Sequence, residues 1–249
     1  MIVVSDIVKH FQDAKRGVVR AVDGVSFECC PGEIFGLLGA NGAGKTTLMR
    51  LLSTVISPTS GTATIAGHDI VHEPEKVRQS IGFMSTTTAL YTRLTPREMI
   101  TYMGRLYGLR GKDLERRVDE VIEMLQITEF QDRLCDKLST GQKQRVSLAR
   151  TILHDPPVLF FDEPTAGLDV LASRTIMEFI EERKQSGKTV VFCTHIMSEA
   201  ESLCDRICVL HAGKVAAIGT FEDLKRLTGE ERLEKVFLSL VEETPVLAR

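Results

Sequence analysis

The chain has 249 residues, of which 43% are hydrophobic and 26% charged, and its formal net charge is −3. This length allows one large α/β domain or two small lobes. The charge shows no basic excess of the kind that nucleic-acid-binding proteins carry, so we expect no nucleic-acid partner. No apolar run approaches the ~18 residues of a membrane-spanning helix, so the chain is not expected to cross a bilayer. The N-terminal residues are charged by residue 9, so no secretory signal is expected either.

Short apolar runs rich in Val, Ile and Phe alternate with longer helical patterns, which favours an α/β fold with a parallel sheet covered on both faces. A first helix is expected at Thr46–Leu52. The predicted strands are, in chain order, Val25–Glu28, Ile34–Leu38, Thr62–Ala66, Ile81–Met84, Val158–Phe161, Thr189–Cys193, Ile207–Leu210 and Val215–Ile218.

The alternation of strands and helices stops between Pro96 and His154. Apolar residues spaced three and four apart predict helices there, at Arg97–Leu109, Asp113–Leu125 and Gly141–His154. We therefore expect one domain over residues 1–220, with a core (1–90 and 155–220) and a helical subdomain (about 91–154). Residues 221–249 are expected to form a short helical appendage.

A phosphate-binding loop is predicted at Gly39–Thr46, which follows an apolar strand and precedes a helix. Glycines let the backbone N–H groups approach phosphate, Lys45 places a positive charge on the β- and γ-phosphates, and Thr46 supplies a hydroxyl ligand for Mg²⁺. A glycine-rich turn without a ligand is the alternative, and the strand–loop–helix context argues against it. The residues predicted to bind ATP here are Gly39, Ala40, Asn41, Gly42, Ala43, Gly44, Lys45, Thr46 and Thr47.

Two adjacent acids, Asp162 and Glu163, end the apolar strand Val158–Phe161. Buried carboxylates are costly unless they meet a cation, so Asp162 is predicted to face Mg²⁺ together with Thr46. Glu163 would point elsewhere and polarise the attacking water as a general base. A solvated strand end is the alternative interpretation.

His195 follows another predicted strand, Thr189–Cys193. The carboxyl ends of parallel strands line one crevice where ligands bind, so His195 is predicted to face the same γ-phosphate. A purely structural histidine is the alternative.

The segment Leu138-Ser139-Thr140-Gly141-Gln142-Lys143-Gln144-Arg145 resembles the signature motif of the ABC (ATP-binding cassette) ATPases, usually Leu-Ser-Gly-Gly-Gln. The phosphate loop, Asp162-Glu163, Ala166-Gly167-Leu168-Asp169 and His195 stand in the order of that family. The resemblance covers nearly the whole chain. It implies the α/β fold of ABC ATPases: a phosphate-loop core with a mixed, mainly parallel sheet, antiparallel strands at the N-terminal side and a helical insertion.

Ser139 and Gly141 stand at a predicted helix start, where hydroxyl and backbone N–H groups can bind an anion. In the family, two cassettes pair head to tail, and each ATP lies between one phosphate loop and the signature of the other chain. The resemblance therefore implies that Ser139, Thr140, Gly141 and Gln142 contact the ATP of a partner cassette. It also places Phe11 against adenine and Asp169 in a loop at the dimer seam. A core phenylalanine is the alternative for Phe11.

Two positions depart from the family pattern. Thr140 replaces a signature glycine, which adds a side chain near the site of the γ-phosphate. Thr86 stands where the family has a glutamine that touches Mg²⁺ or water and senses the membrane partner. Thr86 is therefore a candidate coupling position whose usual chemistry is in doubt.

The flanking sequences resemble ATPase subunits of bacterial ABC exporters, including the sodium-export group. The resemblance implies an Mg²⁺-dependent ATPase that drives an integral membrane permease from the cytoplasmic face of the cell membrane, with a second cassette, an identical chain, as partner. Two alternatives stay open: a soluble ABC ATPase in cofactor assembly or another non-transport role, and a nucleotide-dependent switch with little hydrolysis.

Overall fold

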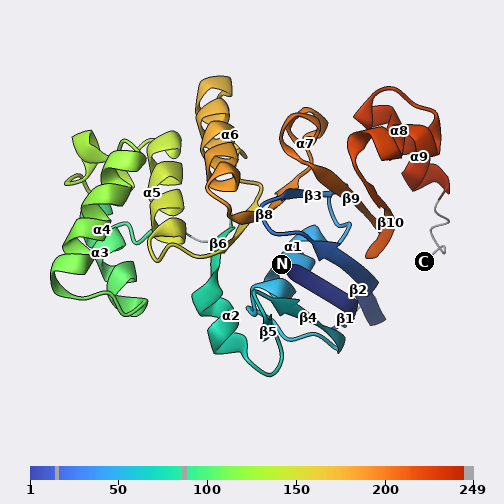
Figure 1. The fold of residues 1–249 in the computed structure, drawn as a ribbon, viewed down its shortest axis with the longest axis horizontal. Helices are drawn as coiled ribbons and strands as arrows, with labels where there is room; N and C mark the ends of the chain where they lie inside the picture. The colour runs from blue at the N-terminus through green and yellow to red at the C-terminus, as the bar shows by residue number, and fades with distance from the viewer. Residues whose placement is uncertain (15–16, 86–88, 244–249) are drawn as a thin grey trace.

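A six-stranded sheet lies at the centre of the computed structural model, which describes residues 1–14, 17–85 and 89–243 (Figure 1). Its strands are β3 (Ile34–Leu38), β6 (Ile81–Ser85), β7 (Val158–Asp162), β8 (Thr189–Thr194), β9 (Arg206–His211) and β10 (Lys214–Gly219). The strand order is β10-β9-β3-β8-β7-β6, and the pairs are parallel except for β9 with β10. β3, β7 and β8 are buried along their whole length, which accounts for their continuous apolar sequences. The predicted mixed, mainly parallel sheet is confirmed.

A second, antiparallel sheet is built from β1 (Ile2–Asp13), β2 (Gly17–Cys29), β4 (Ser60–Ile65) and β5 (His68–Asp69), in the order β2-β1-β4-β5. It confirms the expected antiparallel strands at the N-terminal side. The predicted strand Val25–Glu28 covers only the end of β2, and β1 was not predicted. β1 pairs with β2 through several register shifts, so its apolar residues do not alternate regularly.

Helices fill the space between the sheets and cover the outer face of the central one. α1 (Lys45–Leu52) and α2 (Pro74–Ser80) belong to the first group, and α6 (Val170–Gln185) and α7 (Met197–Leu203) to the second. Leu48, Met49 and Leu51 of α1 share one apolar cluster with residues of both sheets. The phosphate loop at the start of α1 is therefore fixed by packing on two sides.

The helices α3 (Pro96–Leu106), α4 (Gly111–Met124) and α5 (Thr140–Ile152) lie between β6 and β7 in the sequence and at one end of the molecule (Figure 1). Single 3₁₀ turns at Thr128–Phe130 and Cys135–Lys137 connect α4 to α5. The three predicted helices lie close to these bounds.

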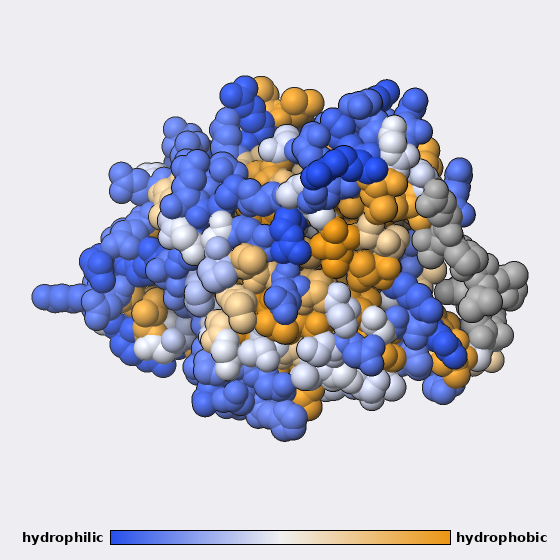
Figure 2. Space-filling model, turned by 45° about the vertical axis from the view of Figure 1, so that its right-hand side comes forward, coloured by the Kyte–Doolittle hydropathy of each residue, from blue (hydrophilic) through white to orange (hydrophobic). Residues whose placement is uncertain are grey.

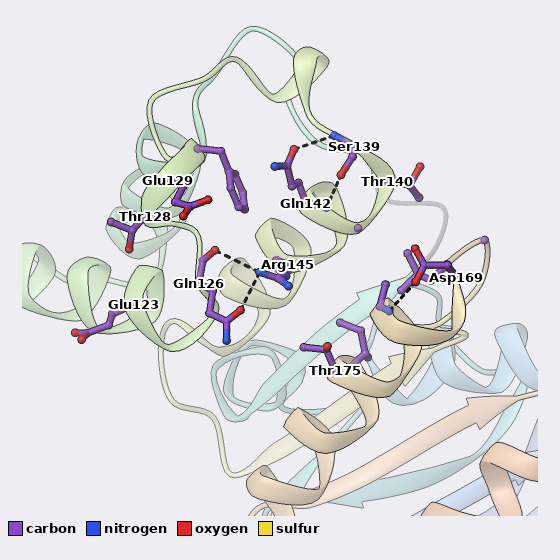
Figure 3. Close-up of a pocket in the computed structure, with 16 residues that line it drawn as sticks. Glu123, Gln126, Thr128, Glu129, Ser139, Thr140, Gln142, Arg145, Asp169 and Thr175 are labelled. Carbon is purple, nitrogen blue, oxygen red and sulfur yellow. Dashed lines mark hydrogen bonds between the residues drawn. The ribbon is translucent and has the colours of Figure 1, made fainter.

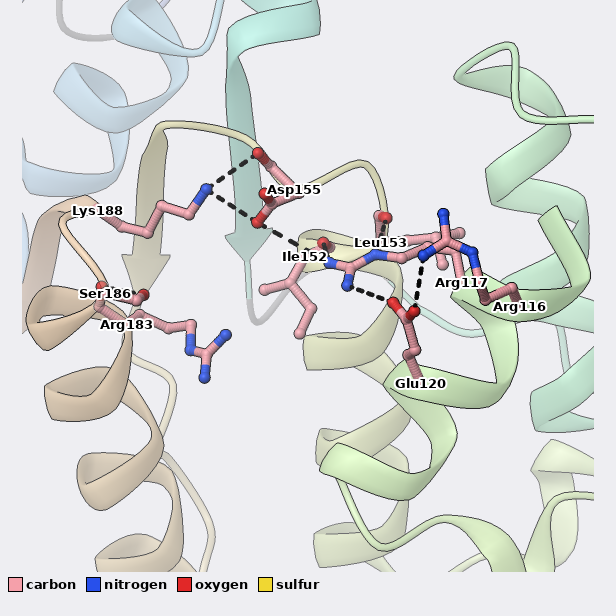
Figure 4. A network of polar contacts seen from close by, with 9 residues as sticks. All are labelled: Arg116, Arg117, Glu120, Ile152, Leu153, Asp155, Arg183, Ser186 and Lys188. Atoms are coloured by element: carbon pink, nitrogen blue, oxygen red, sulfur yellow. Dashed lines mark hydrogen bonds and ion pairs between the residues drawn. The ribbon is translucent and has the colours of Figure 1, made fainter. Parts of the chain in front are cut away.

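Arg117 joins α4 to the end of α5 (Figure 4). Its guanidinium donates to the carbonyl oxygens of Leu153 (2.8 Å) and Ile152 (3.1 Å), at the end of α5. The last carbonyls of a helix lack partners inside the helix, so the guanidinium satisfies groups that would otherwise be unpaired. Beside it, Lys188 pairs with Asp155 at 2.8 Å and links the segment before β8 to the segment before β7.

Two C-terminal helices, α8 (Phe221–Thr228) and α9 (Leu233–Glu243), lie at the opposite end in Figure 1. They share an apolar cluster with Leu38 of β3 and Ala200 of α7. The C-terminal helices pack mainly against β9, β10 and α7.

The face shown in Figure 2 has apolar side chains near its middle and hydrophilic ones around them. Among the described residues, every helix is too short or too polar to cross a lipid bilayer.

Candidate functional site

The phosphate loop runs from the end of β3 into α1, and its last glycine marks the start of that helix. Gly44 is the N-cap of α1 and has a φ of +106°. The Lys45 side chain is buried, and its ammonium donates to the carbonyl oxygens of Gly39 (2.6 Å) and Ala40 (3.2 Å). The loop thus combines a helix N-terminus with a cation held in place by the loop's own backbone. This combination suits a phosphate group.

Asp162 is the last residue of β7 and faces this loop, although β8 lies between β7 and β3 in the sheet. Its side chain is buried, and burial raises the pKa of its carboxyl, with a further increase from the Glu163 carboxylate. The Cys193 thiol, the Thr46 hydroxyl and the Lys45 charge act in the opposite direction on this pKa.

One oxygen of Asp162, Oδ1, is buried without a hydrogen-bond partner among the described residues. A buried carboxylate oxygen that lacks a partner suits a hard divalent cation, which prefers oxygen ligands. Asp162 and the Thr46 hydroxyl are the residues that could hold such an ion.

Glu163 and His195 meet at the carboxyl edge of the sheet, although 32 residues separate them. His195 Nδ1 lies 3.0 Å from Glu163 Oε1. Asp162 pairs with Cys193 in the sheet, and the Glu163 N–H donates to the Cys193 carbonyl at 2.9 Å, which brings the two strand ends together. Glu163 has a φ of +51°, a strained backbone conformation for this residue type and one often found at functional sites.

The signature residues lie elsewhere, at the start of α5 (Figure 3). Ser139 is the N-cap, and its hydroxyl accepts from the Gln142 N–H (3.3 Å) while Gln142 Oε1 accepts from the Ser139 N–H (3.0 Å). Thr140 and Gly141 begin the helix. Ser139 and Thr140 are exposed, so the N-terminus of α5 opens to the surface.

Asp169 lies across a cavity of about 940 Å³ from Ser139 and caps α6, where its Oδ1 accepts from the Ala172 N–H at 2.9 Å. None of residues 39–47, all of which are described, lines this cavity. The two groups of predicted ATP contacts therefore lie apart within one chain.

Phe11 lies in β1 opposite Val19 and is 42% exposed, with the Lys9 ammonium 5.3 Å from its ring centroid. It is therefore not a core residue, which was the alternative interpretation of its sequence. Thr86 lies outside the described residues.

Two contacts near the site were not predicted from the sequence. The Cys193 thiol interacts with the Asp162 carboxyl, and the Gln144 side-chain amide donates to the Pro164 carbonyl, which joins α5 to the segment after Glu163. Both depend on strand and helix neighbours that are distant in the sequence. The sequence spacing of these residues indicates neither contact.

A phosphate loop that faces a buried carboxylate, at the carboxyl edge of a mainly parallel sheet, defines the class as the phosphate-loop nucleoside triphosphatases. The family model described as ABC transporter matches residues 22–166. The ABC transporter ATP-binding protein NatA of Bacillus subtilis (strain 168) is 39% identical over 240 residues, which are 96% of this chain and 97% of NatA. The linearmycin resistance ATP-binding protein LnrL of the same organism is 36% identical over 93% of this chain and 75% of LnrL.

Solved structures similar to this chain belong to the same family. An ATP-binding subunit of an ABC transporter superposes with a TM-score of 0.86 at 30% identity, over 96% of this chain and 99% of that one. A dimer of the ATP-binding cassette MJ0796 with bound ADP and Pi gives a TM-score of 0.80 at 26% identity, over 88% of this chain and 98% of that one. The chain belongs to the ABC transporter family, as an ATP-binding subunit. The resemblance inferred from the signature motif is confirmed, and so is the ATPase activity that it implied.

Proposed function

We propose that this chain powers an ABC exporter and that two copies bind ATP between them, head to tail. The observation that carries the proposal is that the phosphate loop and the signature belong to separate surfaces of one chain. Each half is suited to phosphate, but the signature cavity contains no phosphate-loop residue. A second copy supplies the missing half of each site, in keeping with the dimeric form of a related cassette.

Within this proposal, Mg²⁺ is held by Thr46 and Asp162, and it neutralises negative charge on the phosphates when it is bound. Glu163 accepts a proton from the attacking water, and His195 orients Glu163 through the 3.0 Å contact and approaches the γ-phosphate. Phe11 offers an exposed ring on which adenine can stack.

Val170 and Leu171 support the dimeric arrangement. They directly follow Asp169 and are 85% and 78% exposed. Large apolar side chains at such exposure mark surfaces that a partner covers. The proposed seam through Asp169 places them at the interface between the two copies.

A second apolar surface supports a membrane partner. Tyr91, Tyr102 and Leu106 are 58%, 43% and 63% exposed, and the two tyrosine rings pack edge to face. They lie on and beside α3, in the part of the chain that follows β6 and residue 86. We propose that an integral membrane permease docks there, which would hold the chain at the cytoplasmic face of the membrane, and that Thr86 participates in the coupling.

The domain division follows from the same proposal. Residues 1–90 and 155–220 form the nucleotide-binding core, 91–154 the helical subdomain that receives the permease, and 221–249 an appendage. Relatives named for linearmycin resistance and Nod factor export favour an exporter. Sodium ions are the solute that the sequence resemblance suggests.

The test of the dimer uses Glu163→Gln, which leaves ATP bound because the general base is missing. General-base assistance is worth roughly 10²–10⁴-fold in rate, so turnover should fall within that range. With ATP and Mg²⁺, the variant should elute as a dimer from a sizing column.

A second substitution locates the interface. Adding Ser139→Arg to Glu163→Gln should keep the chain monomeric while ATP still binds the phosphate loop. Val71→Arg adds the same charged side chain at an exposed residue next to β5, away from the signature; it is the control and should leave the dimer intact. Equal dimerisation of the Ser139→Arg and Val71→Arg proteins would contradict the head-to-tail arrangement.

A further inference from the structure

His195 lies in a two-residue connection between β8 and α7, and the residue before it is held by two hydrogen bonds of its hydroxyl, one buried and one partly buried. The Thr194 hydroxyl donates to Glu199 Oε2 at 2.8 Å and accepts from the Ile196 N–H at 3.0 Å. Thr194 is 2% exposed and Glu199 7%. One hydroxyl thus joins the end of β8, the residue after His195 and the first turn of α7.

Burying a carboxylate such as that of Glu199 has a cost that local contacts must offset. Its position in the first turn of α7 is favourable, because the positive end of the helix dipole lies there. A hydroxyl that donates to a carboxylate also makes a stronger bond than one between neutral groups. Glu199 is therefore well placed to hold Thr194 in one rotamer.

The His195 ring itself has little support from packing. Its side chain is 47% exposed, and the hydrogen bond recorded for it among the described residues is the 3.0 Å contact with Glu163. The direction of an exposed ring depends on the backbone that carries it. That backbone is flanked on both sides by bonds of the Thr194 hydroxyl.

We propose that Thr194 and Glu199 are positioning residues that hold His195 against Glu163. The proposal rests on the catalytic roles proposed above for Glu163 and His195. Both positioning residues are buried, whereas the His195 side chain is exposed. Their contribution is to keep His195 Nδ1 within hydrogen-bond distance of Glu163 while ATP is hydrolysed.

A purely structural role is the competing interpretation, because losing any buried hydrogen bond lowers stability. Thr151 provides a matched control. It is 3% exposed, and its hydroxyl donates to the Ser147 carbonyl at 2.8 Å inside α5, away from His195. Thr194→Val and Thr151→Val each remove one buried threonine hydroxyl and keep the β-branched shape.

The experiment measures kcat, KM for ATP and the thermal midpoint of the full-length variants. We expect both valine variants to lose stability, and Thr194→Val to lose more because it leaves the buried Glu199 carboxylate without this partner. Only Thr194→Val should lower kcat, by roughly tenfold to a hundredfold, because small misplacements of catalytic groups cost that much. KM should change little, since the phosphate loop is untouched. Thr194→Ser restores the hydroxyl, and Glu199→Gln keeps an oxygen acceptor. Both should recover most of the turnover, unlike Glu199→Leu.

A double-mutant cycle shows whether the effect passes through His195. In a His195→Ala background, adding Thr194→Val should lower kcat no further, because there is no ring left to position. If the two losses add, or if Thr194→Val and Thr151→Val have equal kcat, the positioning role is wrong. Full turnover of His195→Ala alone would instead refute the proposed role of His195, which separates the two failures.

Discussion

At the scale of single residues, Gly44 shows how the phosphate loop is held in one conformation. Its φ of +106° lies in the region that residues with a Cβ rarely adopt. A Cβ at this position would also overlap the carbonyl oxygen of Ala21 in β2 and would lie 3.3 Å from Leu210 Cδ2 in β9. At Gly44 the loop therefore lies tightly between the two sheets and has no room for a side chain.

Gly44→Ala should therefore destabilise the fold and abolish ATP binding, because the backbone of Ala21 cannot move without disturbing β2. Gly67→Ala is the matched control: Gly67 has a φ of +86° but open space around its Cβ position. This variant should lose only roughly 1–2 kcal/mol of stability, the cost of placing an alanine in the left-handed backbone conformation, and keep normal turnover. Denaturant unfolding and ATP titration check both variants, and equal losses would show that the contact with Ala21 is unimportant.

Sequence reasoning identifies such residues well when their chemistry follows from local spacing. The phosphate loop and the pair Asp162-Glu163 needed only the order of strand, loop and helix. The 3.0 Å contact between His195 and Glu163 could not be predicted from the sequence, because the order of strands in a sheet is a three-dimensional property. Glu199 was missed for another reason: its burial follows from the packing of α7 against β3 and β8, and an acid on a short helix is normally exposed.

At the scale of elements, two helices begin with the same capping arrangement but serve different purposes. Ser139 and Gln142 cap α5, and Thr95 and Glu98 cap α3, with bonds of 2.9–3.3 Å. In each case, the side chains satisfy N–H groups that the first turn leaves unpaired. Of these two helices, α5 has its N-terminus at the signature cavity, whereas no residue of α3 lines that cavity.

Ser139→Ala and Thr95→Ala should each cost about 1 kcal/mol of stability, the usual value of a lost N-cap. Only Ser139→Ala should also lower turnover and weaken the ATP-dependent dimer, because we propose that its hydroxyl also contacts the partner's ATP. Urea midpoints, turnover and sizing of both variants in ATP give the comparison. Equal turnover of the two proteins would mean that Ser139 acts as a cap alone.

The helices and strands could be predicted from the sequence where all of their residues have the same degree of burial. β3, β7 and β8 are buried on both faces, and each predicted strand lies within one residue of the observed bounds. α6 was not predicted, because its buried residues are only Ile176, Phe179 and Ile180 among many charged ones, and it starts with exposed Val170 and Leu171. The apolar residues of α6 therefore lie partly in the core and partly on the exposed surface, so they do not form a single buried face.

At the scale of the whole molecule, His154 joins the helical segment to the central sheet. It follows α5, its Nε2 lies 2.9 Å from the Ile81 carbonyl oxygen of β6, and its ring stacks on Tyr107 with 3.6 Å between centroids. Burial lowers the pKa of His154 from 6.5 to about 4, and the charges of Arg117 and Lys188 act in the same direction. The contact with Ile81 and the charge of Asp155 oppose this shift.

The direction of this shift predicts how stability depends on pH. Between pH 6.5 and about 4, the unfolded chain binds a proton at His154 that the folded chain does not, so the free energy of unfolding falls as the pH falls through this window. The contribution is fully present above pH 6.5, and its total loss is on the order of 3 kcal/mol. The pKa of Asp69 is lowered to about 2, so its contribution to stability is lost in a more acidic window, as the pH falls below the ordinary value of 3.8.

His154→Phe removes the titrating group and keeps an aromatic ring against Tyr107. Urea unfolding near pH 7.5 and near pH 5 should show a smaller difference in the variant than in the wild type, although the variant is less stable at the higher pH because the contact with Ile81 is lost. Above pH 7 the two proteins should share one pH dependence, since His154 is neutral there in both the folded and the unfolded state. Parallel curves throughout the acidic range would mean that the helical segment is held to the sheet without a neutral His154.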